Sequence, residues 1–225
     1  MKTYKEELLK LRKEKLKEFN KNLIPNLDKE LIGVSNPNIK KLSKNVDYEF
    51  LENLPHKYYE EDILHGYMLA NLNLDFDKTI EEIEKFLPCV TNWAVCDTMC
   101  KNIKAFKNDR KKLFDKSIEW CRTNKTYYIR FGLSMQLSYC LTDEFIDDII
   151  DNIYTISNHD YYCDMMIAWL LATIMINYEN KVFDALKQNK LNVFIKRKTI
   201  SKAIDSFRIS DTTKMKLKEL RKFLF

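Results

Sequence analysis

The stretch DYYCDMMIAWLLATIMI, residues 160–176, is almost entirely apolar from Met165 onward. It is too short to cross a bilayer, which takes about 20 helical residues. It also contains neither glycine nor proline, the residues that most often interrupt a helix. An apolar run of this kind predicts a helix that is buried on most of its sides.

Helix-breaking residues are scarce in the rest of the chain as well. The 225 residues include three glycines and four prolines, and all four prolines lie at or before Pro88. Residues 89–225 therefore hold one glycine, Gly132, and can be helical throughout with interruptions only at caps. Asn-Gly and Asp-Gly, the dipeptides typical of β-hairpins, are absent from the sequence. We predict an all-α protein.

Capping residues recur ahead of apolar positions at helical spacing. They predict roughly a dozen helices of about 10 to 20 residues, joined by short links. The expected starts are Asn36-Pro37, Asp47, Asp77, Thr91 or Asn92, Asn108, Asn124, Thr142, Asn158, Asn192 and Ser210. Tandem helices without a long linker favour either a bundle or a helical solenoid.

The spacing of prominent side chains bears on that choice. Trp93, Arg130, Trp169 and Arg208 follow one another at intervals of 37, 39 and 39 residues. This is close to the about 40-residue unit of HEAT-type repeats, in which the inner helices of successive pairs line one concave surface. Because identity between the units is weak, the spacing alone leaves bundle and solenoid both open.

Charge is distributed unevenly along the chain. The formal net charge is +5, yet residues 187–225 hold 12 basic and three acidic side chains, and residues 143–151 are strongly acidic. Such asymmetry suits a polyanion bound on one side. The alternative interpretation is a set of solvated helix faces.

Several kinds of site are excluded or disfavoured by composition. No two glycines lie within thirty residues of each other, which excludes glycine-rich phosphate-binding loops. Among the six cysteines, Cys96 and Cys100 come nearest to a metal-ligand spacing, but buried free thiols are the favoured interpretation. The histidines His56, His65 and His159 have no triad-like context. We expect no metal and no organic cofactor.

The N-terminus, MKTYKEELLKLRKEK, is charged from its second residue and lacks an apolar signal core. Together with the absence of a spanning segment, this predicts a protein of the reducing cytoplasm with no membrane association.

Trp93 and Asp97 form the most suggestive pair. In TNWAVCDTMC they are four residues apart, so a helix places both on one face. An indole offers a π-face to a cationic base, and a carboxylate offers charge opposite a developing oxocarbenium ion. Trp169 is a second indole on the most apolar helix. The alternatives are core packing for the tryptophans and an exposed or capping role for Asp97.

Arg130 lies in TYYIRFGLSMQL, which is otherwise apolar and aromatic. A guanidinium there needs a partner, either a carboxylate within the protein or a phosphate outside it. The sequence leaves both possibilities open.

Five segments occur in order and carry a family resemblance. They are LIGVSNPNIKKLSKNV (31–46), YYEEDILHGYMLAN (58–71), FLPCVTNWAVCDTMC (86–100), YYIRFGLSMQL (127–137) and DYYCDMMIAWLLATI (160–174). Together they resemble the AlkD-like DNA alkylation repair family of HEAT-like DNA glycosylases. The resemblance covers roughly residues 5–222, and its most specific element is N-W-x-x-x-D at residues 92–97.

The resemblance implies a fold, a reaction and a set of site residues. The fold is a right-handed superhelical solenoid of HEAT-like helix pairs, forming one domain over residues 1–225 whose concave face holds double-stranded DNA. The reaction is hydrolysis of the N-glycosidic bond of N3- or N7-alkylated purines, without flipping the lesion into a pocket. Asp97 is the expected catalytic carboxylate, with Trp93 and Trp169 flanking the damaged nucleotide. The expected DNA contacts are Arg130, Lys40, Lys41, Lys202 and Arg208. We expect a monomer.

Three positions depart from the family pattern. Met165 and Ala172 stand where basic residues are usual, and Tyr59 stands where histidine is usual. Each change removes a potential phosphate contact or groove polarity. Two alternatives to an active glycosylase follow: a DNA-binding relative that does not cleave, and a helical-repeat scaffold whose concave face binds protein.

Overall fold

The chain's computed structural model describes residues 4–25 and 27–224. Within them there are fourteen α-helices and two short 3₁₀ helices but no β-strand, and the one β-bridge pairs Glu30 with Tyr58. The predicted all-α class is confirmed.

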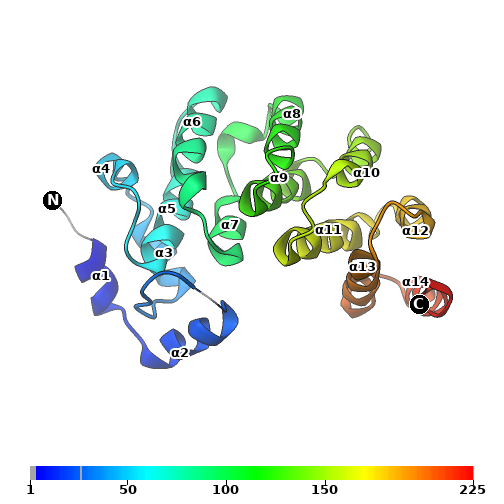
Figure 1. Cartoon of the computed structure of the whole chain (residues 1–225). Helices are drawn as coiled ribbons and strands as arrows, with labels where there is room; N and C mark the ends of the chain where they lie inside the picture. Colours follow the sequence, from blue (N-terminus) through cyan, green and yellow to red (C-terminus); the bar gives the residue numbers. More distant parts are fainter. Residues whose placement is uncertain (1–3, 26, 225) are drawn as a thin grey trace. The chain divides into compact units, whose positions relative to one another are not determined.

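The helices follow one another along the chain, and most of the links between them are short (Figure 1). In chain order they are α1 (Tyr4–Lys10), α2 (Glu14–Leu23), α3 (Asn36–Leu42), α4 (Tyr48–Glu52), α5 (Tyr59–Asn71), α6 (Phe76–Phe86), η1 (Leu87–Cys89), α7 (Trp93–Met99), η2 (Lys104–Phe106), α8 (Arg110–Cys121), α9 (Thr126–Tyr139), α10 (Ile146–Thr155), α11 (Tyr161–Ile174), α12 (Glu179–Lys187), α13 (Val193–Asp205) and α14 (Asp211–Leu224).

The chain divides into two compact units, with the boundary between Arg110 and Lys111. In the first unit α5 is central and packs against α3 on one side and α7 on the other. In the second unit α11 lies between α9 and α13, and α14 packs on α13 (Figure 1). Within each unit, alternate helices along the chain are therefore neighbours.

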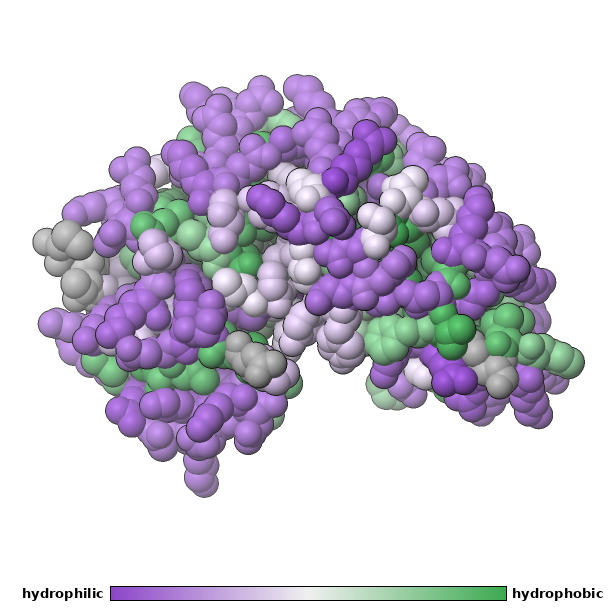
Figure 2. All heavy atoms as spheres, viewed as in Figure 1, coloured by the Kyte–Doolittle hydropathy of each residue, from purple (hydrophilic) through white to green (hydrophobic). Residues whose placement is uncertain are grey.

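The apolar run at residues 160–176 forms α11, the centre of the second unit. Nine of its fourteen residues are buried, so the prediction of a largely buried helix is confirmed. Around it lies a core that draws on every helix from α8 to α14. No helix in the described part of the chain is long and apolar enough to cross a membrane. Hydrophilic side chains cover much of the visible surface (Figure 2).

Several predicted caps are confirmed by hydrogen bonds. Asp47, Asn92 and Asn192 each accept a bond from the backbone N–H three residues later, which satisfies an otherwise unpaired donor of the first turn. The prediction that Asp77 marks the start of a helix is wrong, because Asp75 caps α6 by accepting a hydrogen bond from the N–H of Lys78 at 2.9 Å.

Other starts lie slightly beyond the predicted residue. Asn158 lies in the turn before α11, where its amide donates to the Asn124 carbonyl, and Asp160 is the cap. Thr142 likewise precedes the cap of α10, which is Phe145. A polar residue a few positions before a helix can belong to the preceding turn instead of capping the helix, and the sequence does not distinguish the two roles.

The predicted repeat interval is also different in the structure. Helices α7, α9, α11 and α13 begin at Trp93, Thr126, Tyr161 and Val193, so their starts are about 33 residues apart. The interval of nearly 40 residues arose because the prominent side chains occupy different positions within their helices. Trp93 begins α7, for example, whereas Trp169 lies in the second half of α11.

A buried carboxylate anchors the chain in the first unit. Glu60 is fully buried and accepts the backbone N–H groups of Ile32, Gly33 and Val34 at 2.9, 2.7 and 3.3 Å. Gly33 has φ +97°, and a Cβ there would lie 2.7 Å from the carbonyl oxygen of Lys13. The segment before α3 is thereby held against the start of α5.

Candidate functional site

Helix α7 carries the catalytic pair predicted from sequence. The Oδ1 atom of Asn92 accepts from the N–H of Val95 at 3.0 Å and begins the helix at Trp93. Val95, Cys96 and Met99 are buried against the unit. One side of this short helix is thus buried in the core of the first unit.

Trp93 and Asp97 lie on the other side of α7. Both are partly exposed, and they are one helical turn apart, so the indole and the carboxylate share an accessible face. The predicted common face is therefore present in the structure.

Close packing against α5 sets the position of α7. A Cβ added at Gly66 of α5 would lie 3.2 Å from the Cγ of Met99, tighter than most side-chain contacts. The glycine lets the two helices approach, which fixes which side of α7 remains accessible.

No sequence pattern indicated the ion pair that lies close to the start of α7. The Nζ of Lys29 lies 2.8 and 2.6 Å from the two carboxylate oxygens of the buried Asp62. Burial raises the pKa of Asp62 to about 7, with Lys29 opposing the rise. Burial also raises the pKa of the nearby Cys89 thiol, and the hydroxyl of Thr91 donates to Asp28 at 2.8 Å. These residues join three segments of the first unit.

In the second unit Arg130 donates to a partner that the sequence did not indicate, a backbone carbonyl. It is 5% exposed, and one guanidinium nitrogen donates to the backbone carbonyl of Tyr162 at 3.1 Å. This bond ties α9 to the first turn of α11. A contact from Arg130 to DNA stays a prediction.

Trp169 is partly exposed and packs its inner side against the core of the second unit. It belongs to a partly exposed line along α11 that also includes Tyr162, Met165 and Thr173. Both descriptions of Trp169 from sequence, core packing and an accessible indole, therefore apply to different parts of its surface.

The predicted DNA-contacting residues differ in exposure. Lys40 and Lys41 are exposed on α3, Lys202 is half-buried on α13, and Arg208 is exposed in the turn after α13. Lys196, one of the C-terminal basic residues, is buried at 7% exposure and adds little to the surface charge of that region.

The three departures from the family pattern have different surroundings. Tyr59 is buried, and burial raises the pKa of its hydroxyl. Ala172 is 6% exposed, whereas Met165 lies on the partly exposed line of α11. Of the two positions on α11, only Met165 would present a basic side chain at the surface without disturbing the core.

Among the described residues no group of three or more His, Cys, Asp or Glu side chains is arranged to hold a metal ion. Cys96 and Cys100 are both buried free thiols, and the Sγ of Cys100 donates to the carbonyl of Cys96 at 3.1 Å.

The candidate residues are divided between the units. Trp93, Asp97, Lys40 and Lys41 belong to the first, and Arg130, Trp169, Lys202 and Arg208 belong to the second. The structure brings together Trp93 with Asp97 on α7 and, separately, Arg130 with the α11 helix that carries Trp169.

Comparison with known proteins identifies the family. No individual curated protein matches the chain. A protein family described as DNA alkylation repair enzyme matches residues 4–207, nearly the whole chain. The match agrees with the family predicted from the five ordered segments and implies DNA as the substrate. The chain belongs to the family of DNA alkylation repair enzymes.

Proposed function

We propose that the protein is a DNA glycosylase that hydrolyses the N-glycosidic bond of cationic N3- or N7-alkylated purines in duplex DNA, without flipping the base into a pocket. The main support is the indole and carboxylate on one accessible face of α7, in a member of a DNA alkylation repair family. We propose further that it acts in the cytoplasm as a monomer, without metal or cofactor.

The chemistry needs few groups. Alkylation places a positive charge on the purine, so the bond from C1′ to the purine nitrogen breaks with its electron pair passing to the base, which leaves neutral. No general acid is required. The sugar becomes an oxocarbenium cation, which the Asp97 carboxylate stabilises electrostatically. Water held by the same carboxylate adds to C1′ and gives up its proton to it.

The remaining residues would bind and orient the DNA. Trp93 and Trp169 would flank the damaged nucleotide, and Arg130, Lys40, Lys41, Lys202 and Arg208 would contact the backbone. We propose that the helices form a right-handed superhelical solenoid of HEAT-like pairs over residues 1–225. The ordered packing of α3, α5 and α7 in one unit, and of α9, α11 and α13 in the other, supports this arrangement.

A DNA-binding relative that does not cleave is the second candidate. The observation that favours it is Met165, which occupies an accessible position on α11 where the family usually has a basic residue. A missing cation close to Trp169 would weaken the hold on the backbone beside the lesion.

Release of free 7-methylguanine or 3-methyladenine from methylated duplex DNA tests the proposal. We expect release by the wild-type protein and a fall of roughly 10²-fold or more in rate for Asp97→Asn, because the variant loses the charge opposite the sugar cation. The exposed Asp77 of α6 offers a matched control in the same unit, and Asp77→Asn should keep the wild-type rate.

Each outcome of this experiment distinguishes between the candidate functions or between candidate catalytic residues. No release by the wild type, with DNA binding intact, would establish the non-cleaving relative. Equal rates for the wild type and Asp97→Asn would show that another residue serves as the catalytic carboxylate. Because Asp97 is a partly exposed residue, the substitution should change the free energy of unfolding by no more than about 1 kcal/mol.

A further inference from the structure

A row of aromatic rings crosses the N-terminal ends of α9, α11 and α13 in the second unit. The ring centroids of Tyr127 and Tyr162 are 5.9 Å apart, those of Tyr162 and Tyr161 are 5.2 Å apart, and those of Tyr161 and Phe194 are 5.8 Å apart. We call these four residues the aromatic row. Three helices that start about 33 residues apart in sequence thus contribute to one surface.

The aromatic row is accessible. Tyr161 is 55% exposed, and the other three residues are partly exposed. All four lie in the first two residues of their helices, at the ends of the helices. Core packing therefore does not account for the row, because Tyr161, one of its two middle rings, keeps more than half of its surface in solvent.

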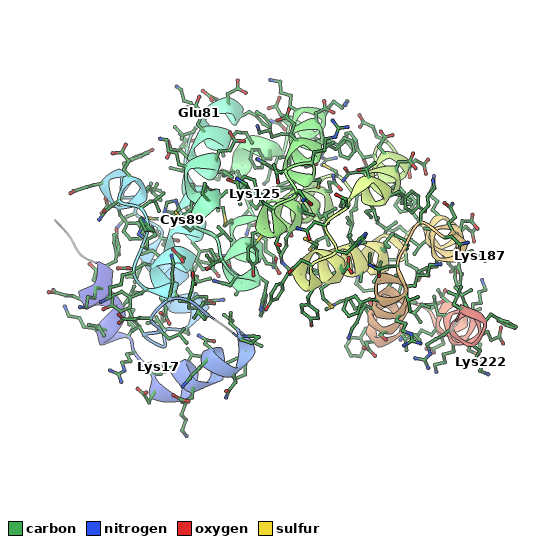
Figure 3. The ribbon with its side chains drawn as sticks, viewed as in Figure 1. Lys17, Glu81, Cys89, Lys125, Lys187 and Lys222 are labelled. Atoms are coloured by element: carbon green, nitrogen blue, oxygen red, sulfur yellow. The ribbon has the colours of Figure 1, made fainter. Side chains whose placement is uncertain are left out.

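Cations lie at both ends of the row. The Nζ of Lys125, labelled at the start of α9 in Figure 3, is 4.8 Å from the ring centroid of the neighbouring Tyr128. The Nζ of Lys198 is 5.5 Å from the ring centroid of Phe194. Accessible aromatic rings with lysines beside them are typical of proteins that bind single-stranded nucleic acid.

The acidic groups next to the row are engaged in hydrogen bonds. Asp160 accepts from the backbone N–H of Tyr162 at 2.9 Å and caps α11. Asp164 is buried, and Asn192 donates to it at 2.8 Å. The Arg130 bond to the Tyr162 carbonyl holds the first turn of α11 against α9. The row is thus held in place, with lysines near its two ends and the exposed carboxylate of Asp160 beside Tyr161.

The row shares a face of α11 with Trp169, one of the two residues proposed to flank the damaged nucleotide. Tyr162 and Trp169 are seven residues apart on α11, which is two helical turns or about 10 Å along one face. A DNA strand that reaches Trp169 along this face also passes the aromatic row.

We propose that the aromatic row stacks against unpaired nucleobases of a DNA strand, with Lys125 and Lys198 at the phosphates. Paired bases are already stacked on their neighbours, so accessible aromatic rings of this kind favour bases that have lost their partners. The inference rests on the proposed function only in taking DNA as the ligand.

A single-stranded oligodeoxynucleotide containing 2-aminopurine, whose fluorescence changes on stacking, tests this. We expect saturable quenching by the full chain, an affinity reduced about tenfold by Tyr161→Leu, and recovery in Tyr161→Trp, which restores a ring. Tyr48 of α4 is also 55% exposed and lies in the first unit, so Tyr48→Leu is the matched control and should bind as the wild type does.

The salt dependence of the affinity distinguishes a contribution from stacking from a contribution from charge. The loss caused by Tyr161→Leu should persist as salt is added, whereas the loss caused by Lys125→Ala should shrink, because only the second is screened. Equal affinities for the wild type and Tyr161→Leu, or an equal loss in Tyr48→Leu, would overturn the proposal.

This test is independent of base release. A protein that releases methylated purines but does not quench the oligonucleotide would refute the role of the aromatic row alone. A protein that binds the oligonucleotide through Tyr161 but releases no base would refute the glycosylase alone.

Discussion

At the scale of single residues, two buried histidines in the first unit share one hydrogen bond. The Nε2 of His56 lies 2.9 Å from the Nδ1 of His65, and the rings stack on Phe50 and Phe86 with centroid distances of 4.3 and 3.8 Å. Burial lowers the pKa of His56 to about 4, and burial together with His56 lowers that of His65 well below its usual value. The pair is therefore neutral in the folded protein at neutral pH.

This predicts a loss of stability on acidification. In the unfolded chain a histidine has a pKa of about 6.5, so between about pH 6.5 and 4 protons bind preferentially to the unfolded state. The free energy of unfolding of the first unit should fall as the pH drops through this window, by up to about 2 kcal/mol for His56 at pH 5.

The double variant His56→Phe/His65→Phe isolates the effect, because it replaces both partners with rings of similar shape. The raised pKa of Asp62 acts in the opposite sense, since that carboxyl takes up a proton more readily when folded. The difference between the wild type and the double variant is therefore the quantity to measure, by denaturant titration at about pH 7.5 and about pH 5. An identical pH dependence in both proteins would contradict the prediction.

At the scale of helices, glycine sets the distance between α8 and α9. A Cβ on Gly132 would lie 2.5 Å from the carbonyl oxygen of Ser117 and 2.9 Å from the Sγ of Cys121. The nearest of these atoms is backbone, so the helices must separate to admit a methyl group. Gly66 is a natural comparison, since a Cβ there meets only the flexible side chain of Met99 within 3.4 Å.

We predict that Gly132→Ala destabilises the second unit by about 1 to 3 kcal/mol, even though alanine favours a helix by about 1 kcal/mol over glycine. Gly66→Ala should lie within about 1 kcal/mol of the wild type, because the Met99 side chain can move and the helix preference offsets the strain. Urea denaturation followed by circular dichroism measures both. Equal destabilisation would mean that the α8 to α9 contact yields more readily than its geometry indicates.

At the scale of the molecule, positive charge is concentrated toward the C-terminus. Residues 187–225 carry a formal net charge of +9, against +5 for the whole chain. Lysines on the outer faces of α12 and α14 include Lys187 and Lys222 (Figure 3). Association with a polyanion through such residues releases counterions and is therefore sensitive to salt.

We predict that the affinity for duplex DNA falls steeply with added salt. The variant Lys202→Gln/Arg208→Gln should make the negative slope of log K against log salt shallower by about 2, or about 0.9 per lost phosphate contact. The control is Lys10→Gln/Lys21→Gln, the same charge change on exposed residues of α1 and α2. Fluorescence anisotropy over a range of salt concentrations gives the slopes. A decrease as large in the control would assign the effect to net charge rather than to contacts.

The features that could be predicted from sequence depend on neighbours a few residues away. Helix class, the caps at Asp47, Asn92 and Asn192, and the shared face of Trp93 and Asp97 all follow from backbone geometry within one or two turns. The cap of α6 was misplaced because Asp75 and Asp77 are both suitable residues, and only the hydrogen bond to Lys78 distinguishes them.

Contacts between residues far apart in the sequence could be found only in the folded chain. The Arg130 bond to Tyr162, the Lys29 pair with Asp62 and the aromatic row join residues 32 to 35 positions apart. Contacts over such separations depend on how each helix is rotated and how closely it packs, which glycines such as Gly66 and Gly132 control. The sequence alone determined the helices, the family and the residues suited to glycosidic chemistry, because local spacing and ordered motifs carry that information. Tertiary packing determined which of those side chains are exposed and which are held by a neighbouring helix.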